Sequence, residues 1–229
     1  MESHEKTENL QILDSGREIN LWRGDLYKDY LKRLLDYFLS FLLLPIILPV
    51  LGILIALIKL DSKGPAIFTS ERIGRDGRKF HIYKLRTMCV NAEEKLKEIL
   101  RENKNLFREW EKDHKLKRDP RITRVGRIIR RLSFDELPQI FNVIKGDMSF
   151  VGPRPIVEAE IIKYRTFYKS YESVRPGITG LWQVNGRNDT SYEKRVQLDR
   201  AYASDLSLTQ DLSIMFKTIP AAVSKKGAY

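Results

Sequence analysis

Two adjacent carboxylates follow a pair of arginines in the run RRLSFDELPQ, residues 130–139. Ser133 precedes Glu136 by three residues, which is the spacing of a helix-capping box, so we expect a helix to begin at Ser133. Asp135 then lies in the first turn, where the positive end of the helix dipole favours its ionised form. Such a carboxylate can attack an electrophile or hold a divalent cation near a diphosphate, although acidic residues at a helix start commonly only stabilise the helix.

Two loops rich in proline and glycine carry further polar side chains. In Gly152-Pro153-Arg154-Pro155 the prolines restrict the backbone around Arg154, which suits an arginine that holds a phosphate in one geometry. The run RPGITGLWQVNGR, residues 175–187, offers a planar ring, two amides and a guanidinium for a base and a phosphate. These are Trp182, Gln183, Asn185 and Arg187. Simple structural turns remain the alternative for both loops.

The composition limits the partners of these residues. The 229-residue chain carries 41 Lys and Arg against 30 Asp and Glu, a formal charge of +11, which favours an anionic partner. The single cysteine, Cys89, excludes a disulfide framework and a cysteine-based zinc site. The basic residues between 117 and 131 recur mainly every third position and so form a broad surface, suited to nucleic acid, membrane headgroups or a nucleotide diphosphate, or simply solvated. No nucleic-acid reading module accompanies them, so nucleic acid is not expected.

An apolar segment precedes all of these motifs. Tyr37–Ile58 contains 22 residues without a charge, and as a helix it would be roughly 33 Å long, the thickness of a bilayer core. Pro45 and Pro49 predict a bend in this helix. Basic residues flank both of its ends, and because basic residues favour the cytoplasmic side of a membrane, neither end is predicted to lie outside. We therefore expect a re-entrant membrane helix over residues 32–60, with an ordinary kinked span as the alternative. Residues 1–31 are expected to form an interfacial segment, because aromatic, leucine and basic residues alternate in its second half.

Residues 61–229 are polar and are expected to form one globular domain, and the expected fold class is α+β, mostly helical, with a small β-element. Strands are expected at Ala66–Ser70 and Lys79–Leu85, and the two proline-glycine segments at 151–155 and 176–180 are expected to be loops. The helices are expected at Ala92–Lys117, Arg121–Arg131, Phe134–Val143, Glu158–Ser173, Tyr192–Ser204 and Leu208–Ala222.

Taken in this order, the motifs resemble one family closely, the bacterial sugar transferases that are monotopic phosphoglycosyl transferases, also called polyprenyl-phosphate hexose-1-phosphate transferases. The matching segments are KRLLDYFLSFLLLPIILP (Lys32–Pro49), IFTSERIGRDGRKFHIYKLRTM (Ile67–Met88), RRLSFDELPQIFNVIKGDMSFVGPRP (Arg130–Pro155), RPGITGLWQVNGR (Arg175–Arg187) and the tail KKGAY. The resemblance covers about Lys28 to Tyr229.

The resemblance implies a reaction and roles for particular residues. A sugar 1-phosphate would pass from a nucleotide-diphosphate sugar, such as a UDP-hexose, to undecaprenyl phosphate, with UMP released. Asp135 and Glu136 match the family's catalytic pair, with Asp135 as the nucleophile and as a ligand of Mg²⁺. The polar partners implied by position are Lys84, Arg130, Arg154 and Asp199, beside Gln183, Asn185 and Arg187. Pro49 matches the proline that breaks the family's membrane helix.

The resemblance also implies a setting. The catalytic domain would lie on the cytoplasmic face of the bacterial inner membrane, as a minimal catalytic form that is compatible with a homodimer. The tail ending in Gly227-Ala228-Tyr229 resembles members that use galactose or glucose. Two rival hypotheses are an inactive membrane-anchored scaffold of polysaccharide assembly and a membrane-tethered nucleic-acid binder; the intact Asp135-Glu136 pair argues against the first.

Overall fold

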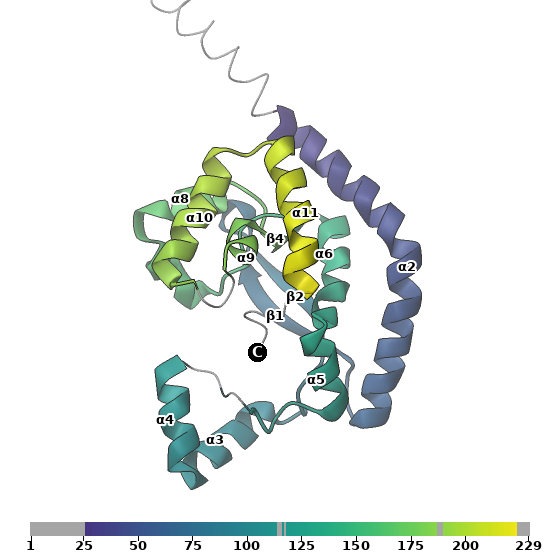
Figure 1. The fold of residues 1–229 in the computed structure, drawn as a ribbon, viewed down its shortest axis with the longest axis vertical. Helices are drawn as coiled ribbons and strands as arrows, with labels where there is room; N and C mark the ends of the chain where they lie inside the picture. The colour runs from purple at the N-terminus through teal and green to yellow at the C-terminus, as the bar shows by residue number, and fades with distance from the viewer. Residues whose placement is uncertain (1–25, 114–115, 117, 187–189, 224–229) are drawn as a thin grey trace, which may run out of the picture.

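The computed structural model describes residues 26–113, 116, 118–186 and 190–223, and this part of the chain is mostly helical with two small two-stranded sheets (Figure 1). The expected fold class is confirmed in these terms. Trp22 and the rest of residues 1–25, Arg187, and the tail from residue 224 lie outside the described residues.

The apolar segment forms one long helix. A short π-helical turn, η2 (Tyr27–Leu31), leads directly into α2 (Lys32–Asp61), which has 30 residues and contains both Pro45 and Pro49. The axis of α2 changes direction in its middle (Figure 1), as expected where proline removes a backbone donor and its ring presses on the preceding turn. Among the described residues, α2 is the one helix long and apolar enough to cross a membrane.

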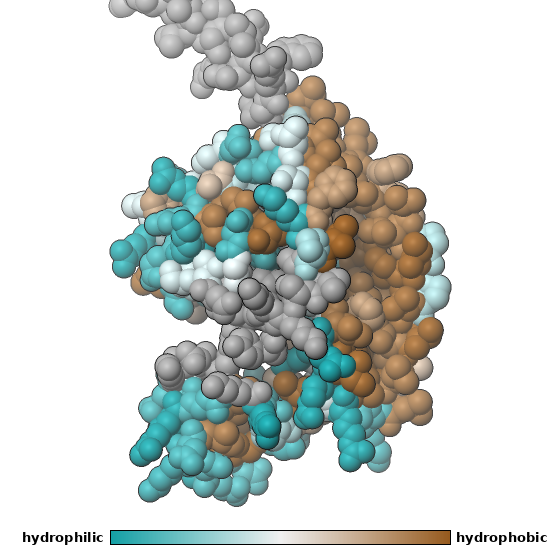
Figure 2. Space-filling view, in the orientation of Figure 1, coloured by the Kyte–Doolittle hydropathy of each residue, from teal (hydrophilic) through white to brown (hydrophobic). Residues whose placement is uncertain are grey.

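Both halves of α2 pack against the same globular body. At the amino-terminal end Lys32 pairs with Asp211, and the Asp36 carboxylate accepts hydrogen bonds from the Ser149 hydroxyl (2.9 Å) and the Phe150 backbone N–H (3.0 Å). In the second half Leu51, Leu54 and Ile58 are buried in a cluster with Ala66, Leu85 and Ile129. The opposite face is apolar and exposed, and it covers one side of the molecule (Figure 2).

An antiparallel hairpin follows α2. Strands β1 (Ile67–Ile73) and β2 (Lys79–Leu85) pair over their full length around a 3₁₀ turn, η3 (Arg75–Gly77), close to the expected positions. In this register Arg72 lies opposite Phe80 and Lys84 opposite Phe68, so Arg72, Ile82 and Lys84 share one face because side chains alternate along a strand.

The expected helix Ala92–Lys117 is wrong as one element, because α3 (Ala92–Glu102) and α4 (Lys104–Asp113) are separate helices. Asn103 between them adopts an extended backbone, and its side-chain oxygen accepts from the backbone N–H groups of Asn105 (3.0 Å) and Leu106 (3.2 Å). Asparagine competes for backbone hydrogen bonds in this way and so starts a new helix. The two helices project from the body as a pair (Figure 1).

Of the two segments expected to be loops, residues 152–155 have no regular structure, as expected, whereas the expectation for 176–180 is wrong because it contains a short strand that pairs with residues 149–151. After α5 (Arg124–Arg131), the 3₁₀ helix η4 (Phe134–Gln139) and α6 (Ile140–Lys145), strand β3 (Ser149–Val151) pairs with β4 (Gly177–Thr179). The backbones approach so closely that a Cβ added to Gly177 would lie 2.1 Å from the Gly152 nitrogen. Glycine therefore serves here for close strand contact rather than for a turn.

The expected helix Glu158–Ser173 is also wrong, because it is divided into four pieces. They are η5 (Glu158–Glu160), α7 (Ile161–Tyr164), η6 (Arg165–Phe167) and α8 (Tyr168–Glu172). Tyr164 and Tyr171 are both buried, with ring centroids 5.0 Å apart, so the breaks direct two aromatic rings into one cluster. The chain ends with α9 (Leu181–Val184), α10 (Tyr192–Ser204) and α11 (Leu208–Val223), the last two as expected.

Candidate active site

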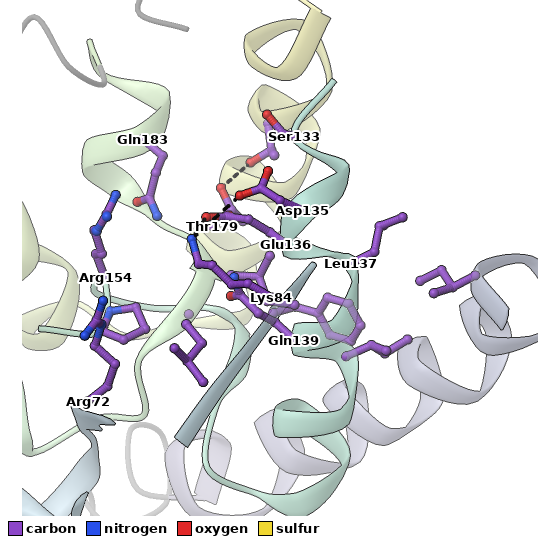
Figure 3. Close-up of a pocket in the computed structure, with 18 of the residues that line it drawn as sticks. Arg72, Lys84, Ser133, Asp135, Glu136, Leu137, Gln139, Arg154, Thr179 and Gln183 are labelled. Atoms are coloured by element: carbon purple, nitrogen blue, oxygen red, sulfur yellow. Dashed lines mark hydrogen bonds and ion pairs between the residues drawn. The ribbon is translucent and has the colours of Figure 1, made fainter. Parts of the chain in front are cut away.

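A pocket of about 410 Å³ lies between the hairpin, η4, the segment after β3, α9 and the inner side of α2 (Figure 3). Charged and polar side chains line part of it: Arg72, Lys84, Ser133, Asp135, Glu136, Arg154 and Gln183. Apolar side chains also line it, among them Leu43, Ile47, Leu137, Ile140, Phe150 and Ile178. The pocket thus joins a cluster of charges to the membrane helix.

Asp135 and Glu136 are carried by η4, directly after α5. The chain turns between the two helices at Ser133, whose φ of 57° is left-handed, and the Ser133 side chain makes no capping hydrogen bond. The predicted capping box is therefore wrong, although a helix does start at the expected place. In the left-handed conformation the Ser133 hydroxyl is directed away from the helix amides, and the Glu136 carboxylate binds Lys84 instead.

Lys84 connects the two carboxylates. Its ammonium donates to Glu136 Oε1 at 2.7 Å and lies 4.0 Å from Asp135 Oδ2. The Asp135 side chain is 19% exposed, so it is largely withdrawn from water but still reaches the pocket. Figure 3 shows Lys84 extending between the carboxylates and the opposite wall.

The protonation of Asp135 reflects opposing effects. Burial raises the pKa of Asp135 and the negative charge of Glu136 raises it further, while Lys84 and Arg130 lower it; the net direction is upward. The helix dipole considered in the sequence acts in the lowering direction, but η4 has only six residues and burial outweighs it. The ionised form of Asp135 therefore depends on the two neighbouring cations.

Arg130 lies beside the pocket rather than in its wall. Its Nε donates to the Thr87 hydroxyl at 2.7 Å, and burial lowers the pKa of the guanidinium while the charge of Asp135 raises it. The position at the end of α5 places this cation near the nucleophile candidate without exposing it to the cavity.

Two arginines occupy the wall opposite the carboxylates (Figure 3). Arg154 lies 5.9 Å from the centre of the Trp182 ring, and burial together with the nearby charge of Arg154 lowers the pKa of Arg72. Placing two guanidinium groups so close together is unfavourable unless an anion lies between them. Arg72 was not predicted as a site residue, although the alternation along the hairpin puts it on the same face as Lys84.

Asp199 lies behind this wall. It is 1% exposed, accepts a hydrogen bond from the Tyr164 hydroxyl at 2.7 Å, and its Oδ2 lies 3.9 Å from Arg195 Nε. Burial raises the pKa of Asp199 to about 6, against the lowering effect of Tyr164 and the arginines. Arg195 in turn stacks on Trp182, with its guanidinium carbon 5.0 Å from the ring centre. Asp199 therefore supports the Trp182 wall from outside the cavity.

The remaining predicted residues divide into two groups. Gln183 lines the pocket, whereas Asn185 is exposed and its amide donates to the Leu181 carbonyl at 2.7 Å, which ends α9. Arg187 lies outside the described residues. The structure thus brings together Lys84, Asp135, Glu136, Arg154 and Gln183, and leaves Arg130, Asn185 and Asp199 outside the lining.

The donor groups are compatible with Mg²⁺. No cluster of three or more Asp, Glu, His or Cys side chains that could hold a metal occurs among the described residues. Mg²⁺ however commonly uses one or two carboxylates together with water and substrate phosphates. Asp135 and Glu136, neighbours in the lining of a pocket with two arginines opposite, fit that mode of binding.

The sequence of this chain is similar to a known protein family and to several named proteins. Residues 27–225 match the family model described as bacterial sugar transferase. The undecaprenyl-phosphate galactose phosphotransferase of Salmonella typhimurium is 48% identical over 200 residues, which are 87% of this chain and 42% of that protein.

Two further relatives differ in length. The exopolysaccharide production protein ExoY of Rhizobium meliloti is 44% identical over 198 residues, 86% of this chain and 88% of that protein. The UDP-glucose:undecaprenyl-phosphate glucose-1-phosphate transferase of Escherichia coli is 39% identical over 207 residues, 87% of this chain and 41% of that protein. The chain therefore spans less than half the length of some relatives and most of the length of another.

Proposed function

The chain belongs to the bacterial sugar transferase family, and on that premise we propose that it transfers a sugar 1-phosphate from a UDP-hexose to undecaprenyl phosphate. The products are undecaprenyl-diphosphate sugar and UMP. The names of two relatives support this acceptor, with galactose in one and glucose in the other. The observation that carries the proposal is a single pocket in which Asp135, Lys84 and Arg154 share space with side chains of the apolar helix α2.

The reaction proceeds in two displacements at one phosphorus atom. An Asp135 carboxylate oxygen attacks the sugar-proximal phosphorus of the donor, a new P–O bond forms, and the bond to the leaving UMP breaks. An oxygen of undecaprenyl phosphate then attacks the same phosphorus and displaces the Asp135 carboxylate, which returns to its starting form. Charge balances in both steps without a proton transfer, so the nucleophile only needs to be ionised.

The cations of the pocket perform separable tasks. Lys84 and Arg130 lower the pKa of Asp135 against the effect of burial and so keep it ionised. Arg154 and Arg72 on the opposite wall neutralise the donor phosphates and stabilise charge on the leaving group. Glu136 holds the Lys84 ammonium at 2.7 Å and so fixes its position beside the nucleophile.

Mg²⁺, bound by Asp135 and Glu136 together with the donor phosphates, would supply further neutralisation of the diphosphate. The chain's own two carboxylates offer it a minimal set of ligands.

The protein acts at the cytoplasmic face of the bacterial inner membrane, with α2 as a re-entrant helix. Both halves of α2 pack on one body through Lys32 and Asp36 in the first half and Leu54 and Ile58 in the second. Its outer face exposes Phe38, Phe41, Ile46 and other large apolar residues. A helix that crosses the bilayer separates its ends by about 30 Å of hydrocarbon, whereas here both ends reach the same polar body.

The test is release of UMP from a panel of sugar nucleotides in the presence of undecaprenyl phosphate. We expect Asp135→Asn to abolish release, because the amide has the same shape but no nucleophilic oxygen anion. The matched control is Asp76→Asn, at an exposed position of the hairpin turn. Unchanged turnover in Asp135→Asn contradicts the nucleophile assignment, and no release by the wild-type protein with any sugar nucleotide favours the inactive scaffold.

A further inference from the structure

Asn142 of α6 carries a buried polar side chain that the reaction described above does not use. It is 0% exposed, and its amide bonds to the backbone of β2 rather than to its own helix. The side-chain nitrogen donates to the His81 carbonyl at 2.7 Å, and the side-chain oxygen accepts from the Tyr83 backbone N–H at 3.0 Å. An amide with both of its polar atoms bonded to one strand joins α6 to β2 in a single register.

The two backbone groups bound by Asn142 lie at the edge of β2 that β1 does not cover. Antiparallel strands bond through the backbone groups of alternate residues. Arg86, which follows β2, donates to the Ala66 carbonyl at 2.7 Å on the β1 side. His81 and Tyr83 are an odd number of positions away from Arg86, so their backbone groups point to the opposite edge. The Asn142 amide satisfies them there in place of a third strand.

Apolar packing accompanies the Asn142 contact but does not fix the register along the strand. Val143 and Met148 form one cluster with Phe80 and Ile82 of β2. Burial of apolar surface is non-directional, so this cluster holds α6 against the strand and tolerates a small slide along it. Hydrogen bonds to two particular backbone groups do not tolerate a slide, because they weaken steeply with distance and angle.

The register matters because the two joined elements carry interacting charges. Lys84 follows Tyr83 on β2, while Asp135 and Glu136 lie on η4, which runs directly into α6. The Lys84 ammonium meets Glu136 Oε1 at 2.7 Å and lies 4.0 Å from Asp135 Oδ2. A slide of α6 along β2 changes both distances, and a misplacement of about 1 Å at a reacting centre can lower a rate by about 10²-fold.

We propose that Asn142 is a positioning residue for the first displacement, because its bonds to β2 hold the Lys84 ammonium beside Asp135 and Glu136. The inference rests on the proposed function and adds what fixes the geometry of its charged groups. Asn142 is not among the described residues that line the pocket, so it acts on the reaction only through Lys84. The test therefore has to separate this role from a contribution to stability alone.

A chemical cross-link reports on the Lys84–Glu136 contact without any enzymatic activity. A carbodiimide activates a carboxylate, and a lysine amine in contact with it then forms an amide and releases a urea; mass spectrometry locates the product. The exposed pair Lys79–Glu158, at 2.8 Å, is the reference within the same protein. Asn142→Leu keeps the size of the side chain and removes both hydrogen bonds. We expect a severalfold lower ratio of the Lys84–Glu136 product to the reference, and a wild-type ratio would overturn the proposal.

UMP release with and without Lys84 then shows whether Asn142 acts through this lysine. We expect Asn142→Leu to lower kcat per folded molecule by about tenfold or more, since misplacement near a reacting centre has effects of this size. In the Lys84→Met background the same change should alter kcat by less than about twofold, because two residues that serve one interaction do not act additively. Equal fold losses in the two backgrounds would overturn the proposal.

Tyr202→Phe is the matched control for a loss of buried hydrogen bonds. The Tyr202 hydroxyl is also 0% exposed and lies 2.8 Å from Asp211 Oδ1 and 3.0 Å from the Val151 carbonyl oxygen, away from β2. We expect this variant to lower the melting temperature while the cross-link ratio stays at its wild-type value. A fall in that ratio as large as in Asn142→Leu would indicate a general effect of destabilisation and overturn the proposal.

A second variant decides the matter if Asn142→Leu does not fold. Asn142→Ala only removes atoms, and we expect the same directions for the cross-link ratio and for kcat; a wild-type ratio or equal losses with and without Lys84 would overturn the proposal. A wild-type protein that releases no UMP overturns the proposed function and this role within it. Release by the wild type together with an unchanged cross-link ratio in the variants overturns the role of Asn142 alone.

Discussion

At the scale of single residues, the chemistry of the pocket depends on how a buried carboxylate keeps its charge. Burial and Glu136 raise the pKa of Asp135, and Lys84 is the largest of the effects that lower it. Arg72 and Arg154 lie on the opposite wall, near enough for the charge of Arg154 to lower the pKa of Arg72, and an anion bound between them would offset this repulsion. Both features lead to measurable consequences.

The first consequence concerns pH. Asp135 acts ionised, so activity is lost as the pH falls through its raised pKa. Replacing Lys84 by methionine removes the main lowering effect, and the pKa of Asp135 rises further. We expect the acidic limb of the kcat/KM profile of Lys84→Met to lie at higher pH than in the wild type, measured by UMP release between about pH 5 and 9.

Lys79→Met is the matched control for this prediction. Lys79 lies on the same strand but is exposed and pairs with Glu71 and Glu158, away from the pocket. An acidic limb at the same pH in Lys84→Met and in the wild type would show that Lys84 does not tune the nucleophile.

Arg72 provides a second test at this scale. Arg72→Gln removes one of the two guanidinium groups expected to hold the donor phosphates. Hydrogen bonds to charged groups contribute about 1.5–3 kcal/mol, so we expect KM for the sugar nucleotide to rise by about tenfold or more. Arg78→Gln, in the exposed turn of the same hairpin, should change neither KM nor kcat. A wild-type KM in Arg72→Gln would remove this residue from the donor site.

At the scale of elements, the pocket depends on short pieces held by unusual contacts. The parallel strands β3 and β4 carry Phe150 and Ile178 into the cavity, and they can pair only because Gly152 and Gly177 lack side chains. The four-piece segment after β3 similarly brings Tyr164 to Asp199, beneath the Trp182 wall. The breaks in this helical segment therefore help to position the Trp182 side of the pocket.

The strand contact predicts a loss of stability on adding one methyl group. A Cβ at position 177 would lie 2.1 Å from the Gly152 nitrogen, and overpacking of this kind costs about 1–3 kcal/mol. We expect Gly177→Ala to lower the melting temperature of the detergent-solubilised protein. The control is Gly52→Ala, where a Cβ meets nothing within 4 Å. Equal melting temperatures for the two variants would show that the β3–β4 contact yields without cost.

At the scale of the whole molecule, one polar body holds both halves of an apolar helix. Lys32 and Asp36 fasten the first half to α11 and β3, while Leu51, Leu54 and Ile58 fasten the second half to the core that includes Leu85 and Ile129. The exposed outer face of α2 then enters the lipid from one side only (Figure 2). The positive charge of +11 suits a body that lies against an anionic membrane face.

This arrangement predicts the sidedness of both helix ends. With Cys89→Ser as background, single cysteines introduced by Tyr30→Cys and Lys63→Cys should both be shielded from a membrane-impermeant thiol reagent in intact cells. Both should react in inverted membrane vesicles, which serves as the control for accessibility. Labelling of one position from outside and the other from inside would indicate a helix that spans the bilayer.

Much of this organisation could be predicted from the sequence, because the signals are local. The 22 uncharged residues from Tyr37 to Ile58 and the alternation of Lys79–Leu85 each depend on neighbours within one element. The adjacent carboxylates Asp135 and Glu136, and the prolines that restrict the backbone on both sides of Arg154, are likewise visible from neighbouring residues in the sequence.

Tertiary structure alone decided the rest, because it depends on contacts between distant segments. The strand pair β3–β4 forms where two three-residue segments, distant in the sequence, meet beside Gly152 and Gly177. The direction of the Asp135 pKa shift follows from burial rather than from the helix that carries it. The bonds of the Asn142 amide to Tyr83 and His81 join residues 59 and 61 positions apart, which no periodicity within one element records.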